Sequence, residues 1–457
     1  MAIEQATGVR FRVRRMLRLG SFQIGSAMGD ILVNSIWNRI LISQLGIPAA
    51  PVSFLLALRY LLAPVSLWVG HLSDTRRLWG LRRTSYIWLG RGLMIVSLPF
   101  LGLSLNRFVL STTDVWGWVF AFLSTLLYGV GTLVSGSPFL ALVRDSAPPE
   151  KQGLAISTAE TILIIFFAVV GIVFSVWMDV YSSRVFWEMV LATMVVGGFF
   201  WFFAVLGVEK RIDRERGRVE WETAVSAEAS FMPVLRKIWS DQRTRLFFLF
   251  LAVATMAAWA QEAVLEPFGA EVFALPFDRT TRFNSYWQTA TVLTLVGGAY
   301  VWRKRPPEQQ SGITMGGLYG MALGMMLLAG AALAQQPRLI EVALLIFGAG
   351  FGVYTFGGLS LMAVMSSDKE AGTYLGLWAI CILISKGLGT FLGGALRDIL
   401  LLGFSLPTAV SYGVIFLLEA AGLITAVFIL TRVDVPGFAQ DVGRIISRTE
   451  AQILSAD

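Results

Sequence analysis

Apolar and polar residues follow one another along this chain in long blocks. Blocks of about twenty apolar residues are long enough to cross a bilayer whose hydrocarbon core is about 30 Å thick. The composition agrees, since 56% of the 457 residues are hydrophobic and only 15% are charged. The pattern predicts an all-α, polytopic membrane protein with 12 transmembrane helices, at residues 21–45, 49–72, 84–105, 115–143, 153–178, 184–208, 244–268, 284–302, 311–335, 338–364, 372–397 and 405–431.

The longest polar stretch separates the sixth and seventh of these helices. We therefore expect a basic cytoplasmic N-terminal arm at 1–20, a six-helix half at 21–208, a cytoplasmic linker at 209–243, a second six-helix half at 244–432 and a cytoplasmic tail at 433–457. Within the linker, Phe231, Leu235 and Trp239 recur at helical spacing. This spacing predicts an amphipathic segment that lies along the membrane surface.

Positive charge is unevenly distributed over the predicted connections. Of the 37 Lys and Arg residues, 27 lie in the termini and the even-numbered connections, and six lie in the odd-numbered ones. Cytoplasmic segments of membrane proteins carry such an excess, so both termini are predicted to be cytoplasmic. The net charge of +7 is thereby explained by topology and by contact with anionic lipids, and nucleic acid is not an expected partner.

A local motif stands between the second and third predicted helices. Its positions are Gly70, Asp74, Gly80, Arg82 and Arg83. Glycine permits close helix approach, an aspartate pairs with a basic group or caps a helix, and arginines hold a loop at an anionic surface. The loop resembles the signature of the major facilitator superfamily, with a longer gap between the aspartate and the second glycine than is usual there.

Further motifs, in the same order along the chain, narrow the resemblance. Together with the signature loop they resemble the PucC and LhaA branch of that superfamily, a bacteriochlorophyll delivery family, from about Phe22 to Val433. The motifs are Trp37-Asn38-Arg39 with Gly46-Ile47-Pro48-Ala49, Leu265-Glu266-Pro267-Phe268-Gly269, and Gly372-Thr373-Tyr374-Leu375-Gly376-Leu377-Trp378 with Gly393-Gly394 and Arg397-Asp398.

The resemblance implies an assembly factor for light-harvesting antenna complexes in the inner, photosynthetic membrane of a bacterium. Its implied cargo is bacteriochlorophyll or chlorophyll, and its implied partners are antenna polypeptides or a reaction-centre complex. The alternative is a proton-coupled secondary transporter of a small amphipathic solute, which the fold and the charges Asp30, Glu262 and Glu266 suggest. No P-loop or nucleophile elbow is present, so we do not expect an enzyme.

Charges inside the predicted helices are costly and therefore mark candidate functional positions. By the helical rise, Asp30 and Arg59 lie at similar depth, which predicts an ion pair between the first two helices. Asn34 lies one helical turn beyond Asp30. This pair is either a static brace or a contact that breaks during a conformational change.

In the second half, Glu262 and Lys386 also come out at similar depth and are predicted to neutralise each other. Glu266 follows one turn later, just before Pro267, where an ordinary helical hydrogen-bond pattern cannot continue. Three interpretations stay open for this carboxylate. It caps a broken helix end, ligates the magnesium of a chlorin, or carries a proton.

The remaining intramembrane charges have no partner that the sequence assigns; they are Arg39, Arg91, Glu160 and Glu419. His71, the only histidine, lies in the signature loop. It is a pigment-ligand candidate beside Glu266, although a loop or interface role is the simpler interpretation. One histidine and one cysteine supply no protein-bound metal site.

Small residues at four-residue spacing predict close helix packing. The two sets are Gly316, Gly320 and Gly324 on the ninth predicted helix, and Gly389 and Gly393 on the eleventh. A face of this kind either packs within the bundle or docks an antenna helix or a flat chlorin ring.

Overall fold

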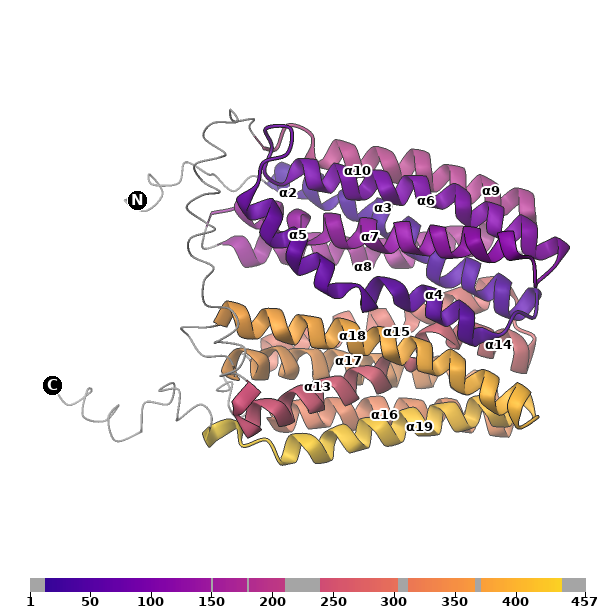
Figure 1. Ribbon diagram of the computed structural model, residues 1–457. Coiled ribbons are helices and arrows are strands. Elements are labelled where there is room, and N and C mark those ends of the chain that lie inside the picture. Colours follow the sequence, from indigo (N-terminus) through magenta and orange to yellow (C-terminus); the bar gives the residue numbers. More distant parts are fainter. Residues whose placement is uncertain are drawn as a thin grey trace. The chain divides into compact units, whose positions relative to one another are not determined.

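The structure, a computed structural model, describes residues 13–148, 151–178, 181–209, 239–302, 311–365 and 371–437. These residues are almost entirely helical (Figure 1). No strand occurs among them, and one isolated antiparallel bridge joins Leu78 to Leu81. The predicted amphipathic segment at 231–239 lies outside the described residues except for Trp239.

The helices follow the predicted order along the chain. Up to residue 209 they are α2 (Val13–Gly20), α3 (Phe22–Asp30), the π-helices η1 (Ile31–Trp37) and η2 (Ile40–Gln44), α4 (Ala49–Leu61), α5 (Ala63–Thr75), α6 (Thr84–Leu110), α7 (Val115–Asp145), α8 (Gln152–Trp177), α9 (Ser183–Ala192), the π-helix η4 (Thr193–Gly197) and α10 (Gly198–Val205). After residue 239 they are α13 (Gln242–Trp259), the 3-10 helix η5 (Ala260–Ala263), α14 (Leu265–Phe273), α15 (Phe277–Trp302), α16 (Ser311–Ala334), α17 (Arg338–Val364), α18 (Ala371–Asp398), the π-helix η7 (Ile399–Gly403) and α19 (Thr408–Thr431).

Ten of the described helices are long and apolar enough to cross a membrane. The prediction of an all-helical, multi-pass membrane protein is therefore confirmed. Two of the twelve predicted spans fall outside this set. The first is divided among α3, η1 and η2, and the eighth, α15, begins with the charged residues Asp278, Arg279 and Arg282.

The second predicted span is interrupted. Instead of one helix over 49–72, α4 ends at Leu61 and α5 begins at Ala63. Pro64, in the first turn of α5, has no backbone N–H to donate, so a continuous hydrogen-bond ladder cannot run through this point.

The described residues form two compact units. The first comprises those within Met1–Ala229, Ala260–Ser285 and Thr390–Ser411, and the second those within Ser230–Trp259, Tyr286–Gly389 and Tyr412–Asp457. Parts of α15, α18 and α19 thus group with the first unit. The predicted boundaries of the two halves, at 208 and 244, stay a prediction.

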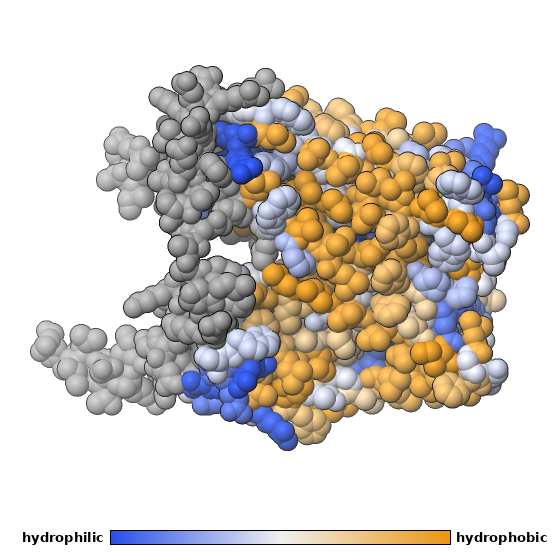
Figure 2. Space-filling model, viewed as in Figure 1, coloured by the Kyte–Doolittle hydropathy of each residue, from blue (hydrophilic) through white to orange (hydrophobic). Residues whose placement is uncertain are grey.

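In the first unit, α6 packs along α7, α4 and α5 also pack on α7, and α3 packs against α8 and α10. Trp37 and Trp201 are fully buried in its core. On the face shown in Figure 2, apolar side chains cover the middle of the helices and hydrophilic ones gather near the helix ends, as expected for a surface that contacts lipid.

In the second unit, α16 packs along α17. A Cβ on Gly317 would lie 2.3 Å from the Tyr354 nitrogen, and one on Gly324 would lie 2.7 Å from Phe347 Cβ. Gly316 has open space instead, so the small-residue face uses Gly317 in its place. This close approach needs residues without a side chain.

Candidate functional site

A break in the seventh predicted span creates the polar centre of the first unit. The helix α13 ends at Trp259, the short 3-10 helix η5 follows, and α14 begins at Leu265. Glu262 lies in η5, and Glu266 lies in the first turn of α14, next to Pro267. Irregular backbone within a membrane span typically lines a cavity or a site that binds polar groups or ions.

The predicted ion pair between Asp30 and Arg59 is present. Arg59 Nη1 lies 2.6 Å from Asp30 Oδ1, and Tyr128 donates its hydroxyl to the same oxygen at 3.0 Å. Arg59 also donates to the Tyr60 hydroxyl, which in turn donates to Glu262 Oε1 at 3.3 Å. A continuous chain of polar contacts therefore links Asp30 to Glu262.

Glu262 also accepts a hydrogen bond from Thr390 Oγ1 at 2.9 Å. Its predicted partner, Lys386, belongs to the second unit, where its Nζ lies 3.2 Å from the centroid of the Trp259 ring. The predicted neutralisation of Glu262 by Lys386 stays a prediction.

Glu266 is 3% exposed and meets side chains of the first and eighth predicted spans. Ser35 donates to its Oε1, and Asn284 donates to the same oxygen at 3.0 Å. Asn34, predicted on the face of the first span that carries Asp30, is half-buried. Ser35, the next residue along the π-helix η1, is the one that contacts Glu266.

Arg39 lies one turn beyond Ser35 on the first span and is 2% exposed. It donates from Nη2 to the Leu275 carbonyl at 2.9 Å, and its guanidinium lies 3.6 Å from the centroid of the Phe277 ring. Its Nε and Nη1 have no hydrogen-bond partner among the residues that the structure describes.

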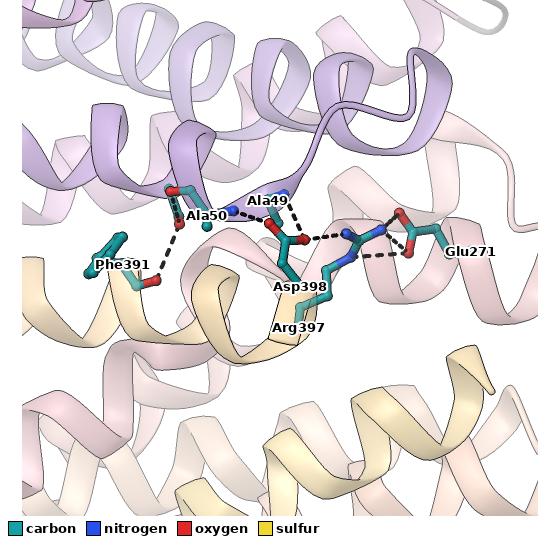
Figure 3. A network of polar contacts seen from close by, with 7 residues as sticks. Ala49, Ala50, Glu271, Phe391, Arg397 and Asp398 are labelled. Atoms are coloured by element: carbon teal, nitrogen blue, oxygen red, sulfur yellow. Dashed lines mark hydrogen bonds and ion pairs between the residues drawn. The ribbon is translucent and has the colours of Figure 1, made fainter. Parts of the chain in front are cut away.

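A second polar network joins α4, α14 and the end of α18 (Figure 3). Arg397 holds Glu271 with two hydrogen bonds from Nη2, at 2.6 and 2.7 Å, and donates from Nη1 to Asp398 at 2.8 Å. The Asp398 carboxylate accepts the backbone N–H groups of Ala49 and Ala50, at 2.9 and 2.6 Å. It therefore caps the N-terminus of α4 from 349 residues away.

The other predicted intramembrane charges lie apart from these networks. The Arg91 guanidinium lies 4.4 Å from the centroid of the Phe22 ring and 5.0 Å from that of Trp201, a cation–π clamp. Glu160 accepts a hydrogen bond of 3.4 Å from Gln23. Glu419 is 3% exposed, and neither of its carboxylate oxygens has a hydrogen-bond partner among the described residues.

The signature loop begins in α5, whose last turns contain Gly70, His71 and Asp74. After it, Trp79 and Gly80 adopt left-handed backbone conformations, which form the tight turn closed by Leu78 and Leu81.

Two acidic residues hold the far side of the loop. Arg83 pairs with Asp145 at 3.0 Å. Glu209 accepts the backbone N–H groups of Arg82, Arg83 and Thr84, at 2.5, 3.0 and 3.0 Å. The first turn of α6 is thus capped by a residue that follows the sixth span.

A groove of about 560 Å³ lies on the surface of the first unit between the third and sixth predicted spans. Trp88 and Ile95 line it from α6, and Gly198, Phe199 and Phe202 line it from α10. Trp88 Nε1 is buried and has no hydrogen-bond partner among the described residues. The groove is apolar and aromatic, with one indole N–H left to donate.

Several of these groups were not predicted from the sequence. Tyr60, Tyr128, Ser35 and Asn284 are common residue types whose importance comes from the carboxylates they contact. The pair Arg397-Asp398 did stand out, but only as part of a motif. Among the described residues no group of three or more His, Cys, Asp or Glu could hold a metal ion.

Comparison with known proteins gives a family. The family model described as PUCC protein matches residues 36–438. A relative named Protein PucC from Rhodovulum sulfidophilum is 29% identical over 400 residues, which cover 84% of this chain and 85% of the relative. A relative named Bacteriochlorophyll synthase 44.5 kDa chain from Rhodobacter capsulatus is 26% identical over 443 residues, which cover 92% of this chain and 95% of the relative.

Solved structures give the fold. A POT family transporter crystallised with a thioalcohol-conjugated peptide has a TM-score of 0.67 at 13% identity, over 94% of this chain and 97% of the transporter. A nucleoside transporter has a TM-score of 0.65 at 13% identity, over 93% of this chain and 100% of the transporter. At this identity the likeness shows a fold of the major facilitator type.

Proposed function

Because the chain belongs to the PUCC protein family, we propose that it is a membrane assembly factor that binds or delivers (bacterio)chlorophyll and assists the assembly of light-harvesting complexes. The observation that carries the proposal is the family match over residues 36–438, together with relatives whose names refer to PucC and to bacteriochlorophyll. A transporter fold suits this role, because carriage of a cargo requires binding and release rather than covalent chemistry.

The proposed setting is the inner, photosynthetic membrane of a bacterium, with both termini in the cytoplasm. The proposed partners are antenna polypeptides or a reaction-centre complex, besides the surrounding lipids and the pigment. The uneven distribution of Lys and Arg supports the orientation.

Within this proposal, the groove between α6 and α10 takes the pigment. Its volume of about 560 Å³ is typical of small-molecule sites. Aromatic walls suit a flat macrocycle, and the buried N–H of Trp88 would donate to a peripheral carbonyl of a chlorin after a side-chain movement that uncovers it. An apolar cargo dissolved in the bilayer reaches such a surface laterally.

The predicted pigment ligands fit this role less well. Glu266 is 3% exposed, so a macrocycle reaches it only after a conformational change. His71 lies in α5, whereas the groove is lined mainly by α6 and α10. Both stay predictions as magnesium ligands.

The test uses the source bacterium without its own copy of the gene, complemented with tagged variants. Gly198→Leu fills the groove, since a Cβ at this position already lies 3.1 Å from Ile95 Cδ1, and Trp88→Phe removes the N–H donor. We expect both to lower antenna absorbance several-fold at equal protein abundance. Phe428→Leu, at an exposed apolar position of α19, is the matched control.

Wild-type antenna levels in the deletion strain would contradict the proposed function. Wild-type levels in both groove variants, beside a defective deletion strain, would contradict only the location of the pigment site.

A second candidate function is proton-coupled transport of a small amphipathic solute. The observation that favours it is the partly buried polar chain from Asp30 through Arg59 and Tyr60 to Glu262, in a fold shared with transporters. Uptake driven by a proton gradient into vesicles, together with normal antenna in the deletion strain, would establish this function in place of the first.

A further inference from the structure

Three segments of the first unit bring buried polar side chains to one place. The first span contributes Ser35, Asn38 and Arg39, at positions that share a helix face. Ser35 contacts Glu266, and Asn38 donates from Nδ2 to the Ala263 carbonyl at 2.9 Å. This face therefore lies along the junction of η5 and α14.

The helix α15 closes the same place from the other side. Its Phe277 lies under the guanidinium of Arg39, and its Asn284 donates to Glu266. Thr281 lies between these two contacts, one turn from each, and therefore faces the same junction. The site is built from three separate elements and does not rest on one helix end.

The two oxygens of Glu266 are unequally satisfied. Oε1 accepts hydrogen bonds from Ser35 and Asn284. Oε2 is buried and has no hydrogen-bond partner among the described residues. A buried carboxylate oxygen without a donor costs several kcal/mol in an apolar surrounding, so a compensating group is expected at this atom.

The neighbouring unpaired atoms comprise two amide oxygens, which only accept hydrogen bonds, the Thr281 hydroxyl, which both donates and accepts, and Nε and Nη1 of Arg39, which donate. Asn38 Oδ1, Gln261 Oε1 and Thr281 Oγ1 have no hydrogen-bond partner among the described residues. These side chains are only 1%, 2% and 2% exposed, so bulk water does not satisfy them. An ionised carboxylate only accepts hydrogen bonds, so it offers no donor to the amide oxygens of Asn38 and Gln261.

We propose that Glu266 is a proton-binding site, in which the proton sits on Oε2 and is donated to the side-chain amide oxygen of Gln261 or Asn38. The carboxylic acid keeps Oε1 as the acceptor for Ser35 and Asn284. One proton thereby turns two unsatisfied acceptors into one hydrogen bond. The proton on Glu266 depends on this junction alone and not on which cargo the protein carries.

The charges around the junction favour a proton over a metal cation. Arg39 already brings one buried positive charge, and Glu266 is the carboxylate among the unpaired groups of this junction. A bound metal ion would have to displace or repel the guanidinium. The other charged groups on the packed elements are engaged elsewhere: Glu262 with Tyr60 and Thr390, Asp278 with Arg282, Glu271 with Arg397, and Asp30 with Arg59.

The test is infrared difference spectroscopy of the full chain in lipid bilayers at neutral pH. A protonated carboxyl group has a carbonyl stretch that a carboxylate lacks, and this band shifts in heavy water. We expect the wild-type spectrum to contain a band that Glu266→Gln removes, while any band from the buried Glu419 stays in that variant. Glu188→Gln, at an exposed glutamate paired with Arg184, is the control and leaves the band unchanged.

A second pair of variants keeps the proposal falsifiable if Glu266→Gln folds poorly. Gln261→Leu and Asn38→Leu each remove one proposed acceptor, and one of the two is expected to raise the band frequency, because the acid loses its hydrogen bond. Spectra of Glu266→Gln that match the wild type would overturn the proposal. So would a band that neither Gln261→Leu nor Asn38→Leu shifts.

Discussion

The Asp398 carboxylate caps the N-terminus of α4 and also contacts Arg397. The helix α4 has no side-chain cap of its own, because Pro48 occupies the N-cap position. Asp398 supplies the acceptors for Ala49 and Ala50 and also takes a hydrogen bond from Arg397. We therefore predict that Asp398→Ala lowers the free energy of unfolding more than an ordinary surface substitution.

The expected loss follows from the contacts. Removal of an N-cap acceptor costs about 0.5–2 kcal/mol. Loss of a hydrogen bond to a charged group costs about 1.5–3 kcal/mol, and the lower end applies because Arg397 keeps its three bonds to Glu271. Together these give about 2–4 kcal/mol. Asp398→Asn keeps one oxygen acceptor and loses the charge, so it should cost about half as much.

The assay is reversible unfolding in mixed micelles, followed by circular dichroism. Glu188→Ala breaks an exposed i,i+4 pair with Arg184 and serves as the control, with a loss of about 0.3–0.5 kcal/mol. The expected order of loss is Asp398→Ala, then Asp398→Asn, then Glu188→Ala. If Asp398→Ala were no less stable than the control, the cap and the charged contact would carry no stability and the argument would be refuted.

Two further predictions concern the same unit. Asp30→Arg and Arg59→Asp should each abolish antenna assembly in the complemented strain, because each leaves a partly buried pair of like charges. The double exchange should restore part of the antenna assembly. If it restores none, the ion pair is not what the function requires. Gly393→Ala should lower stability by about 1–3 kcal/mol or more, because its Cβ would lie 1.9 Å from the Ala260 carbonyl oxygen. Gly403→Ala, with open space around it, should leave the unfolding midpoint unchanged, and equal midpoints for both variants would contradict the close approach.

The sequence predicted the helices and the ion pair between Asp30 and Arg59, because apolar length and depth along a helix are local properties. It did not predict the cap on α4. That contact uses backbone N–H groups 349 residues away from Asp398, and no residue pattern reports such a partner. The interruption near Pro64 was also missed, because the apolar block continues through it.

For Glu266, the sequence predicted the residue but not its contacts. The sequence marked this carboxylate from its place before Pro267. Its partners Ser35 and Asn284 depend on the π-helical register of η1 and on where α15 packs. The groove beside Trp88 is likewise a property of packing, since its aromatic residues have the composition of any lipid-facing surface.

The central claim is that this protein carries a chlorin pigment. The measurement that tests it most directly is the absorption spectrum of the tagged protein, gently solubilised and purified from its native pigmented membrane. We predict a red-absorbing chlorin in stoichiometric amount, which Gly198→Leu reduces and Phe428→Leu retains. A colourless wild-type protein from a pigmented membrane would contradict the account.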